Sequence, residues 1–496
     1  MGVIKRQGIK NTIITYTGIF IGAINVIFIQ PRMLSEEELG FTRLLFDYAY
    51  LIALLMPLGM PNTIVKYFPV YKDRTSGHRG FAGVVLSVFL LGFVLSSVFL
   101  FSFGDELGKL YTAESFKLSQ YFKFLLPFTV ILAAIAVTTS YCQSLFKSTV
   151  PSFLNDIMVR VGIMLVTILY FNHVINFNTY VIFFISIYGL ELLLLVGFIL
   201  IVDRPSIMPD RALFSRAQML PMLRFGLILS LASFASYALR KVDAIILGAA
   251  SLGLAGIYTT AVFIAAFIEV PLAALDRISH TRISASFAAH NLNDIGKIYS
   301  ESVRYLLLAG GFLFVGINAC TRHIYELGNL PQSFMATVDV VYLVGVGALV
   351  NVSTGVNSAI MFYSKHYLLG AFLMVLSLAA TILLNLWLIP IYGIYGAAIA
   401  SLCGATLYNL IKYVFIYRTF GFQPYTFNAA KILLLIIACT GLAHVLPEVT
   451  DAALINLIYK AIAVTVVYVG AAWQLKLAPE IFEALIRRLQ NVSGRK

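Results

Sequence analysis

Apolar residues along this chain gather into fourteen continuous windows separated by polar breaks. The windows cover residues 11–30, 44–65, 81–103, 121–143, 153–171, 178–202, 221–247, 253–275, 304–320, 334–361, 367–389, 393–417, 429–446 and 452–475. A helix needs roughly 20 residues to cross a ~30 Å hydrocarbon core, so each window is long enough to span a membrane with some tilt. The runs are continuous rather than alternating, which favours helices over a β-barrel. The pattern therefore predicts an all-α integral membrane protein with one transmembrane helix for each window.

The basic residues of the breaks are divided unequally between alternate loops. With the N-terminus in the cytoplasm, 25 Lys and Arg residues fall on the cytoplasmic side and 5 on the other, with Lys412 counted in a cytoplasmic break. Cytoplasmic loops are enriched in Lys and Arg, so this division predicts that both termini lie in the cytoplasm. The first window has no cleavage site after it, which predicts an uncleaved first helix.

Composition supports the same class of protein. Of the 496 residues, 60% are hydrophobic and 12% are charged, whereas soluble domains have about 45–50% apolar and about 25% charged residues. The composition therefore excludes a soluble globular protein. The net charge of +12 is explained mainly by the orientation of the loops. We expect no nucleic-acid partner, because no basic patch accompanies an element that would read bases.

One polar break divides the windows into two groups. The break at 203–220 contains Pro205 and Pro209 and is predicted to be a cytoplasmic linker. It separates an N-terminal lobe, residues 1–202, from a C-terminal lobe, residues 221–417. Residues 418–496 then add two helices and an amphipathic cytoplasmic tail. A shift of 216 residues aligns several short segments of the two lobes, which indicates two pseudo-symmetric six-helix halves, with chance similarity between apolar helices as the alternative.

Catalytic motifs are missing from the sequence. It contains no nucleophile elbow, no zinc-protease motif and no phosphate-binding loop. The seven histidines do not have metal-ligand spacing, and the four cysteines, at positions 142, 320, 403 and 439, occur singly. We therefore predict no catalytic residue, no metal and no cofactor, and we expect the chain not to be an enzyme.

Ionisable residues within the apolar windows are the candidates for function, because charges are costly in lipid and usually face a cavity or a partner. Arg240, Lys241 and Asp243 lie on nearly one turn of the seventh window, and the excess of cations suits an anionic group such as a diphosphate. Arg43 and Asp47 are one turn apart in the second window and form either part of such a site or an interfacial ion pair. Further charged residues in apolar windows are Arg160, Glu191, Glu269 and Lys460.

Aromatic and proline residues add two expectations. Four tyrosines are expected either to line a cavity, where rings stack on sugars, or to face lipid and the interface: Tyr48, Tyr50, Tyr237 and Tyr258. Prolines within windows predict kinks at Pro57, Pro61, Pro127 and Pro271.

Three segments resemble one known family. Residues 34–40, LSEEELG, are similar to its opening; residues 242–248, VDAIILG, followed by 255–258, AGIY, resemble its seventh and eighth helices. Residues 385–401, NLWLIPIYGIYGAAIAS, resemble its most specific segment, at helices 11 and 12. This family is the polysaccharide-export (Wzx-type) flippases of the multidrug/oligosaccharidyl-lipid/polysaccharide (MOP) exporter superfamily.

The resemblance implies a MATE-like fold with two six-helix lobes around a cavity that opens alternately to each side. It also implies a function: translocation of a polyprenyl-diphosphate-linked oligosaccharide, such as an O-antigen, capsule or exopolysaccharide repeat unit, across the bacterial inner membrane. Transport would be coupled to H⁺ or Na⁺, and membrane lipids and polysaccharide polymerase machinery are the other expected partners.

On this hypothesis each candidate residue has a role. The expected substrate-binding residues are Arg240, Lys241, Arg160 and Arg43, and the expected ion-coupling residues are Asp243, Asp47 and Glu269. The alternatives are a MATE-type multidrug antiporter, for which a more acidic cavity is expected, and a lipid II flippase. A membrane-embedded glycan-modifying transferase would need paired carboxylates or a histidine beside a sizeable loop.

Overall fold

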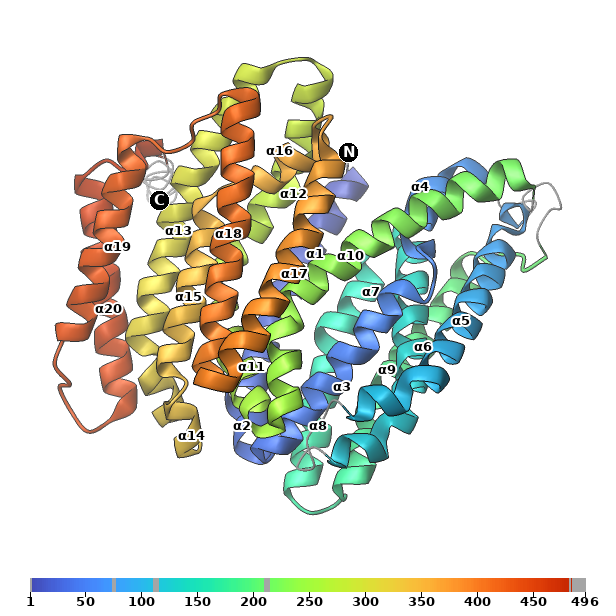
Figure 1. Cartoon of the computed structure of the whole chain (residues 1–496), viewed down its shortest axis with the longest axis horizontal. Helices are drawn as coiled ribbons and strands as arrows, with labels where there is room; N and C mark the ends of the chain where they lie inside the picture. Colours follow the sequence, from blue (N-terminus) through green and yellow to red (C-terminus); the bar gives the residue numbers. More distant parts are fainter. Residues whose placement is uncertain (1, 74–76, 110–115, 209–214, 481–482, 484–496) are drawn as a thin grey trace, which may run out of the picture. The chain divides into compact units, whose positions relative to one another are not determined.

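Long apolar helices account for most of the protein in a computed structural model (Figure 1). The structure describes residues 2–73, 77–109, 116–208, 215–480 and 483, and these contain no β-strand. Among them, 12 helices are long and apolar enough to cross a membrane, and two bent helix pairs raise the number of spans to as many as 14. The predicted all-α membrane fold is confirmed.

The chain divides into two compact units, Met1–Ile257 and Tyr258–Lys496. The first unit contains α1 (Gly2–Ala23), η1 (Ile24–Ile29), α2 (Gln30–Met33), α3 (Glu36–Leu55), α4 (Met60–Tyr71), η2 (His78–Gly80), α5 (Phe81–Lys109), α6 (Phe116–Ser144), α7 (Thr149–Phe153), η4 (Leu154–Met158), α8 (Val159–Phe171), α9 (Phe177–Val202) and α10 (Arg216–Ala250). The boundary between the units falls within α11 (Leu252–Ala266).

The second unit continues with η6 (Phe267–Glu269), α12 (Val270–Ala288), α13 (Leu292–Leu327), α14 (Gln332–Met335), α15 (Val338–Ser353), α16 (Asn357–Tyr363), α17 (Tyr367–Tyr392), α18 (Ile394–Phe420), α19 (Phe427–Val445) and α20 (Ala453–Gln474). The predicted lobes, 1–202 and 221–417, stay a prediction. Parts of two other predicted segments, the linker 203–220 and the tail, lie outside the described residues.

Two spans are broken rather than continuous. In the first unit, α3 and α4 meet at 43° across a break that contains Pro57 and Gly59. The predicted kink at Pro57 is therefore confirmed. Gly59 has φ +80° and lies against the backbone of Gly226 on α10, so a side chain at position 59 would be strained and would also meet that backbone. Pro57, Gly59 and the close contact between Gly59 and Gly226 together fix this bend.

The second broken span joins α15 and α16 at 52°. Its break, Thr354 to Val356, contains no proline, and the proline pattern does not predict it. Gly355 there has φ +60°, a conformation that glycine adopts without a steric penalty. The other predicted kinks differ: α6 continues through Pro127, whereas Pro271 lies in the first turn of α12, directly after the 3₁₀ segment η6.

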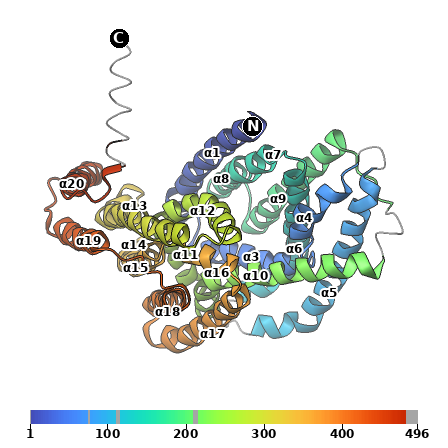
Figure 2. The same cartoon turned by 90° about the horizontal axis from the view of Figure 1, so that it is seen from above.

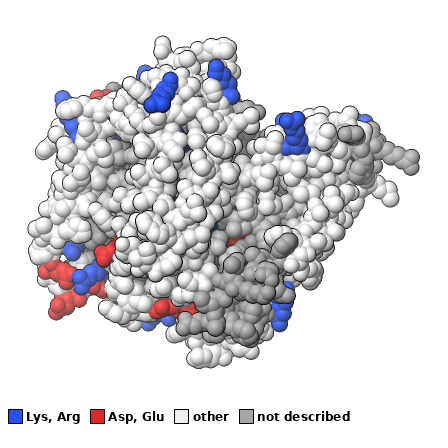
Figure 3. Space-filling model, viewed as in Figure 1, with Lys and Arg blue, Asp and Glu red and all other residues white. Residues whose placement is uncertain are grey.

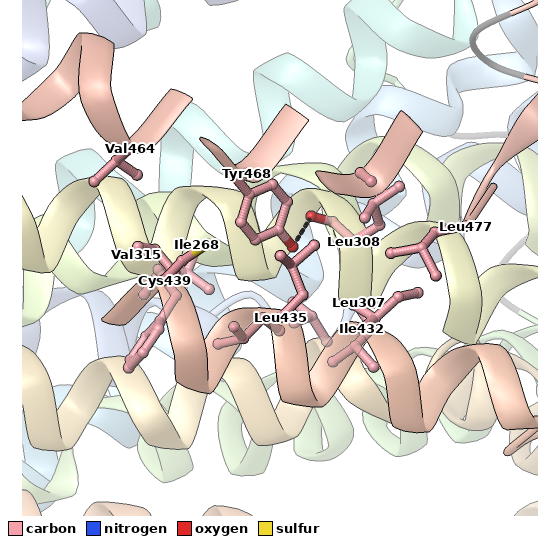
Figure 4. Packing of buried hydrophobic residues seen from close by; sticks show 14 of the residues in the cluster. Ile268, Leu307, Leu308, Val315, Ile432, Leu435, Cys439, Val464, Tyr468 and Leu477 are labelled. Carbon is pink, nitrogen blue, oxygen red and sulfur yellow. Dashed lines mark hydrogen bonds between the residues drawn. The ribbon is translucent and has the colours of Figure 1, made fainter. Parts of the chain in front are cut away.

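The core of the second unit is formed by α13 together with α19 and α20, which lie beside it (Figure 2). Figure 4 shows Ile432, Leu435 and Tyr468 packed against α13, with the Tyr468 hydroxyl donating a hydrogen bond to the Leu308 carbonyl at 2.9 Å. Lipid removes most of the hydrophobic driving force between helices, so close packing and such interhelical hydrogen bonds hold these spans together.

Apolar side chains also cover much of the outer surface. The face drawn in Figure 3 is largely uncharged, and most of the Lys, Arg, Asp and Glu side chains visible on it lie toward its upper and lower margins. Leu193, Ile201 and Leu434 are among the large apolar residues that are exposed on the spans. In water such a surface would cause aggregation, but it suits contact with lipid acyl chains.

Candidate functional site

The clearest charge cluster of the first unit joins α3 to α10. Asp47 on α3 is buried, and its Oδ1 accepts a hydrogen bond from the Tyr237 hydroxyl at 2.6 Å. The Lys241 Nζ lies 3.2 Å from the same oxygen. Tyr237 and Lys241 are four residues apart and therefore share one face of α10. The Lys241 side chain is 34% exposed. The ion pair therefore joins a buried carboxylate to a partly exposed ammonium group.

Aromatic rings adjoin this ion pair. The rings of Tyr50 and Tyr237 have centroids 4.6 Å apart, and Phe46 stacks on Tyr50 at 5.7 Å. The Lys241 Nζ lies 5.9 Å from the centroid of the Tyr237 ring. Rings next to cations and hydroxyls can stack on a sugar while neighbouring groups bind its charged or hydroxyl substituents. Two of the four candidate tyrosines, Tyr50 and Tyr237, therefore lie at the charge cluster.

The three charged residues of the seventh window separate in the structure. Arg240 is exposed and donates a hydrogen bond to Ser236 Oγ at 3.1 Å, and among the described residues no carboxylate lies within 4.0 Å of its guanidinium. Asp243 is buried and accepts a hydrogen bond from the Ala244 N–H. The anion paired with Lys241 is therefore Asp47 from another helix. Of Arg240 and Lys241, Arg240 is the one without a carboxylate within 4.0 Å among the described residues.

Arg43 contacts backbone carbonyls of neighbouring helices. Its guanidinium donates hydrogen bonds to the carbonyls of Gly256, at 3.2 Å, and Val26, at 3.4 Å. These contacts join α3 to α11 and to η1. Asp47 meanwhile pairs with Lys241, so of the two alternatives for Arg43 and Asp47 the structure does not show the interfacial ion pair. The reason is that the carbonyls of neighbouring helices come within reach of Arg43, while α10 brings a lysine to Asp47.

Arg160 lies at a second polar region of the first unit. Its Nη1 donates to the carbonyl of Gly18 on α1, and its Nη2 lies 3.8 Å from Asp156 Oδ1 in the π-helical segment η4. Thr15 on α1 donates to the same carboxylate at 3.3 Å. Arg160 therefore contacts α1 and η4, and these contacts do not include the Asp47–Lys241 pair. Glu191 on α9 is completely buried and interacts electrostatically with Asp156.

Glu269, in η6, belongs to a polar network of the second unit. Its Oε1 accepts from Asn351 Nδ2 at 2.9 Å, and Asn351 Oδ1 accepts from Asn409 Nδ2 at 3.3 Å. Asn409 Oδ1 accepts from Asn357 Nδ2 at 3.3 Å, and Asn357 Oδ1 accepts from Lys412 Nζ at 3.0 Å. We call these five residues the amide relay. It connects a carboxylate to an ammonium group through three side-chain amides.

Sequence reasoning missed most of the amide relay. It counted Lys412 with the cytoplasmic loops, but Lys412 lies within α18, where it is only 1% exposed. That placement was wrong because the hydropathy window ends only five residues later, and hydropathy does not distinguish a buried lysine from one at a helix end. The signal was present in the spacing: Asn409 and Lys412 are three residues apart on one face of an apolar helix.

Family and fold comparisons agree with this architecture. The model of the family described as polysaccharide biosynthesis protein matches residues 8–275. The lipid II flippase MurJ, in an inward closed conformation, is 14% identical, with a TM-score of 0.70 over 94% of this chain and 99% of that chain. An inward-facing multidrug resistance MATE family transporter of the MOP superfamily is 15% identical, with a TM-score of 0.63 over 82% and 94%.

The Vibrio cholerae MATE transporter VcmN, in its bent form, is 16% identical, with a TM-score of 0.54 over 85% of this chain and 98% of that chain. No curated protein matches the sequence. At these identities the likeness to solved structures establishes the fold, which is that of MurJ and the MATE transporters. The family match covers more than half of the chain, and the chain belongs to the polysaccharide biosynthesis protein family.

Proposed function

We propose that this protein is a flippase that moves a polyprenyl-diphosphate-linked oligosaccharide across the bacterial inner membrane by ion-coupled alternating access. Membership of a polysaccharide biosynthesis family supports a glycan-linked substrate, and the MOP fold supports a transport function. The proposal includes cytoplasmic termini, two six-helix lobes, and contact with membrane lipids and with the polysaccharide polymerase.

One observation supports the chemistry of the substrate in particular. Arg240 presents an exposed guanidinium with no carboxylate partner among the residues described, next to Lys241 and to the rings of Tyr50 and Tyr237. A guanidinium binds two phosphate oxygens at once, and rings stack on sugars. A diphosphate attached to a glycan needs both kinds of contact.

The other candidate residues have secondary roles in this proposal. Lys241 is partly neutralised by Asp47, so it adds less to anion binding than Arg240. Arg43 and Arg160 already donate to backbone carbonyls, and they are proposed to hold helices in place around the binding site. Asp47, Asp243 and Glu269 are proposed to take up the coupling ion.

A second candidate function is a lipid II flippase. Its support is the likeness to MurJ, which extends over 94% of this chain. Lipid II is also a polyprenyl diphosphate that carries sugars, so the Arg240 region suits either substrate. The two functions therefore differ in the glycan that is accepted.

Proteoliposomes can separate the two functions. The purified protein is reconstituted with a fluorescent polyprenyl-diphosphate-linked oligosaccharide or with fluorescent lipid II, and a membrane-impermeant quencher reports transfer between leaflets. The proposal predicts transfer of the oligosaccharide and a weaker rate for lipid II. Transfer of lipid II alone would favour the second function, and transfer of neither substrate would contradict both.

A further inference from the structure

The ends of three helices of the first unit meet at one buried polar cluster. The His78 Nε2 lies 2.8 Å from Asp203 Oδ2, and Tyr141, on α6, donates to the same oxygen at 2.6 Å. His78 precedes α5, and Asp203 directly follows α9. The side chains of His78 and Asp203 are at most 1% exposed. The Asp73 N–H donates to His78 Nδ1 at 3.0 Å, so in the neutral ring Nε2 carries the proton and donates it to the carboxylate.

Two further contacts connect neighbouring segments to this cluster. The buried ring of Phe68, on α4, has its centroid 5.0 Å from that of the His78 ring and 4.9 Å from that of the Tyr141 ring. The Ser206 N–H, after α9, donates to the Gly77 carbonyl at 3.2 Å. The ends of α4, α5, α6 and α9 are therefore held together by contacts around one buried histidine–carboxylate pair.

Four exposed basic residues occupy the chain positions next to these helix ends. We call them the cationic patch: Lys72 after α4, Arg79 before α5, Lys147 after α6 and Arg204 after α9. Two carboxylates accompany the patch, those of Asp73 and Asp203, and the Asp203 carboxylate is buried. Among the described residues at these helix ends, the exposed charge is therefore mainly positive.

The backbone presents the patch in an unfavourable conformation. The left-handed position just after a helix usually contains glycine, but Phe146 occupies it after α6, with φ +58°, and Arg204 after α9, with φ +50°. Arg79 has φ +54°. This conformation is unfavourable for residues with a β-carbon, and such strain is retained mainly where it orients a functional side chain. The strain therefore indicates that the orientation of these side chains matters.

The patch is expected at the depth of the lipid headgroups. Three of its four residues lie within three residues of an end of a candidate span, the spans being His78–Ser102, Lys123–Ser144 and Phe177–Val202. A span ends where the hydrocarbon core gives way to the headgroup region, so cations at these positions can reach lipid phosphates.

Exposed apolar side chains adjoin the patch. Phe146 is 62% exposed, and the centroid of its ring lies 5.6 Å from the Lys72 Nζ. Ile207 and Met208, three and four residues after Arg204, are exposed as well. Cations beside apolar groups are typical of a membrane interface, where the cations meet phosphate and the apolar groups meet the acyl boundary.

We propose that the cationic patch binds the headgroup phosphate of an anionic phospholipid, with the buried cluster holding the four cations in place. Phe146, Ile207 and Met208 then contact the glycerol and acyl chains of the same lipid. Each Lys or Arg near an anionic membrane surface strengthens binding by about fivefold, so the patch enriches such lipids around these helix ends. The inference goes beyond the flippase function, because it does not depend on the transported substrate.

Orientation of the chain does not by itself account for the patch. The positive-inside rule requires an excess of Lys and Arg in cytoplasmic loops but no fixed geometry for them. Here the basic residues follow helix ends that a buried histidine, carboxylate and tyrosine hold together. The patch is therefore arranged before a lipid binds, which lowers the entropic cost of binding.

The lipid composition next to the patch tests the proposal in the full-length protein. The four cysteines are replaced by serine, and a bimane fluorophore is attached at Ile207→Cys. The protein is placed without substrate in nanodiscs that contain phosphatidylglycerol or phosphatidylcholine with a quenching nitroxide on the acyl chain near the headgroup. At equal mole fraction, the local concentration of the anionic lipid should exceed that of the zwitterionic lipid by about fivefold or more. The same fluorophore at Leu368→Cys, exposed at the start of α17, should report a weaker preference.

Two matched triple variants identify the residues responsible. Lys72→Gln, Lys147→Gln and Arg204→Gln together should reduce the preference at position 207 to that at position 368. The control removes three exposed basic residues elsewhere: Lys297→Gln, Lys365→Gln and Arg418→Gln. The control should keep the preference at position 207. Loss of the preference in both triple variants or in neither, or an equal preference at the two label positions in the wild-type background, would overturn the proposal.

Tyr141→Phe tests the contribution of the buried cluster. It keeps every charge of the patch but removes the hydroxyl that donates to Asp203, so the preference for the anionic lipid should fall. Tyr170→Phe is the control, because it removes a similar hydrogen bond, from Tyr170 to Glu38 at 2.6 Å, in the same unit. An equal preference in the two variants would overturn the role of the cluster in positioning the patch.

Inorganic phosphate distinguishes a lipid headgroup from a free anion. It is added to the nanodiscs at matched ionic strength, again without substrate. A phospholipid is kept at the surface by its acyl chains and therefore has a high effective concentration there, so the preference should persist. Displacement of the anionic lipid by phosphate would overturn the lipid as the partner of the patch.

Discussion

Each of the two broken spans has a left-handed glycine at its break, but the other contacts that hold the two bends differ. In the first unit, the bend between α3 and α4 depends on Pro57, on the left-handed conformation of Gly59 and on backbone contact with Gly226. In the second unit, the bend between α15 and α16 depends on the left-handed conformation of Gly355, which lies against α13, and also on hydrogen bonds from Thr354 and Lys412. The first bend is held by a proline and backbone packing, whereas the second also depends on a buried lysine.

The ion pairs of the two units differ in how the two charged groups are connected. Asp47 and Lys241 are in direct contact at 3.2 Å, and the lysine is 34% exposed. Glu269 and Lys412 are connected through three amides, and the lysine is buried. In the direct pair the partly exposed lysine is screened by its surroundings, which lowers the contribution of the pair to stability. In the buried pair, the chain of hydrogen bonds couples the charge of Lys412 to the charge of Glu269.

The largest effect on stability is expected for Gly59→Ala. The added methyl group would have to adopt φ +80° and would meet the backbone of Gly226, so we expect a loss of about 3 kcal/mol in unfolding free energy. Unfolding of the purified protein in detergent measures it. Gly197→Ala is the control, because nothing lies within 4 Å of that position. Equal stability of the two variants would show that the first bend is not fixed by packing.

Asn409→Ala is expected to have the next largest effect. Asn409 bonds Asn351, Asn357 and Thr354, and its removal leaves several buried polar groups without partners, at a cost of about 2–3 kcal/mol. Asn385→Ala removes another buried asparagine whose amide donates to one carbonyl, and it should cost about 1 kcal/mol. The same unfolding assay compares them. A smaller loss for Asn409→Ala than for the control would argue against a connected relay.

Asp47→Asn is expected to reduce stability by about 1 kcal/mol, because Lys241 is exposed enough to be solvated when it loses its partner. The double variant Asp47→Asn, Lys241→Met should recover most of that loss. A loss as large as that of Asn409→Ala would mean that the direct pair is as deeply involved in folding as the relay.

Arg240→Ala should have the smallest effect on stability, within about 0.5 kcal/mol, because the side chain is exposed. It should nevertheless raise the substrate concentration needed for half-maximal transfer by about tenfold, the equivalent of one lost charge-assisted contact. For Arg240→Lys, this substrate concentration should lie between the value for the wild-type protein and the value for Arg240→Ala. An unchanged concentration dependence would remove Arg240 from the substrate site.

The fold was predictable from the sequence because fourteen apolar windows translate directly into spanning helices. Proline identified the first broken span, but the second break has only Gly355, and glycine within an apolar window is too common to mark a bend. Side-chain partners were predicted less well. Local spacing suggested Asp47 with Arg43, whereas the partner Lys241 is almost two hundred residues away and becomes a neighbour only through helix packing.

The most direct test of the account compares Arg240→Ala with Glu269→Gln in the same proteoliposome assay, with and without a pH gradient. The account predicts that Arg240→Ala needs more substrate but is still accelerated by the gradient, and that Glu269→Gln keeps its substrate dependence but loses the acceleration. The contrary result, in which both variants change the same property or in which the two effects are exchanged, would contradict a substrate site in the first unit and a proton site in the second.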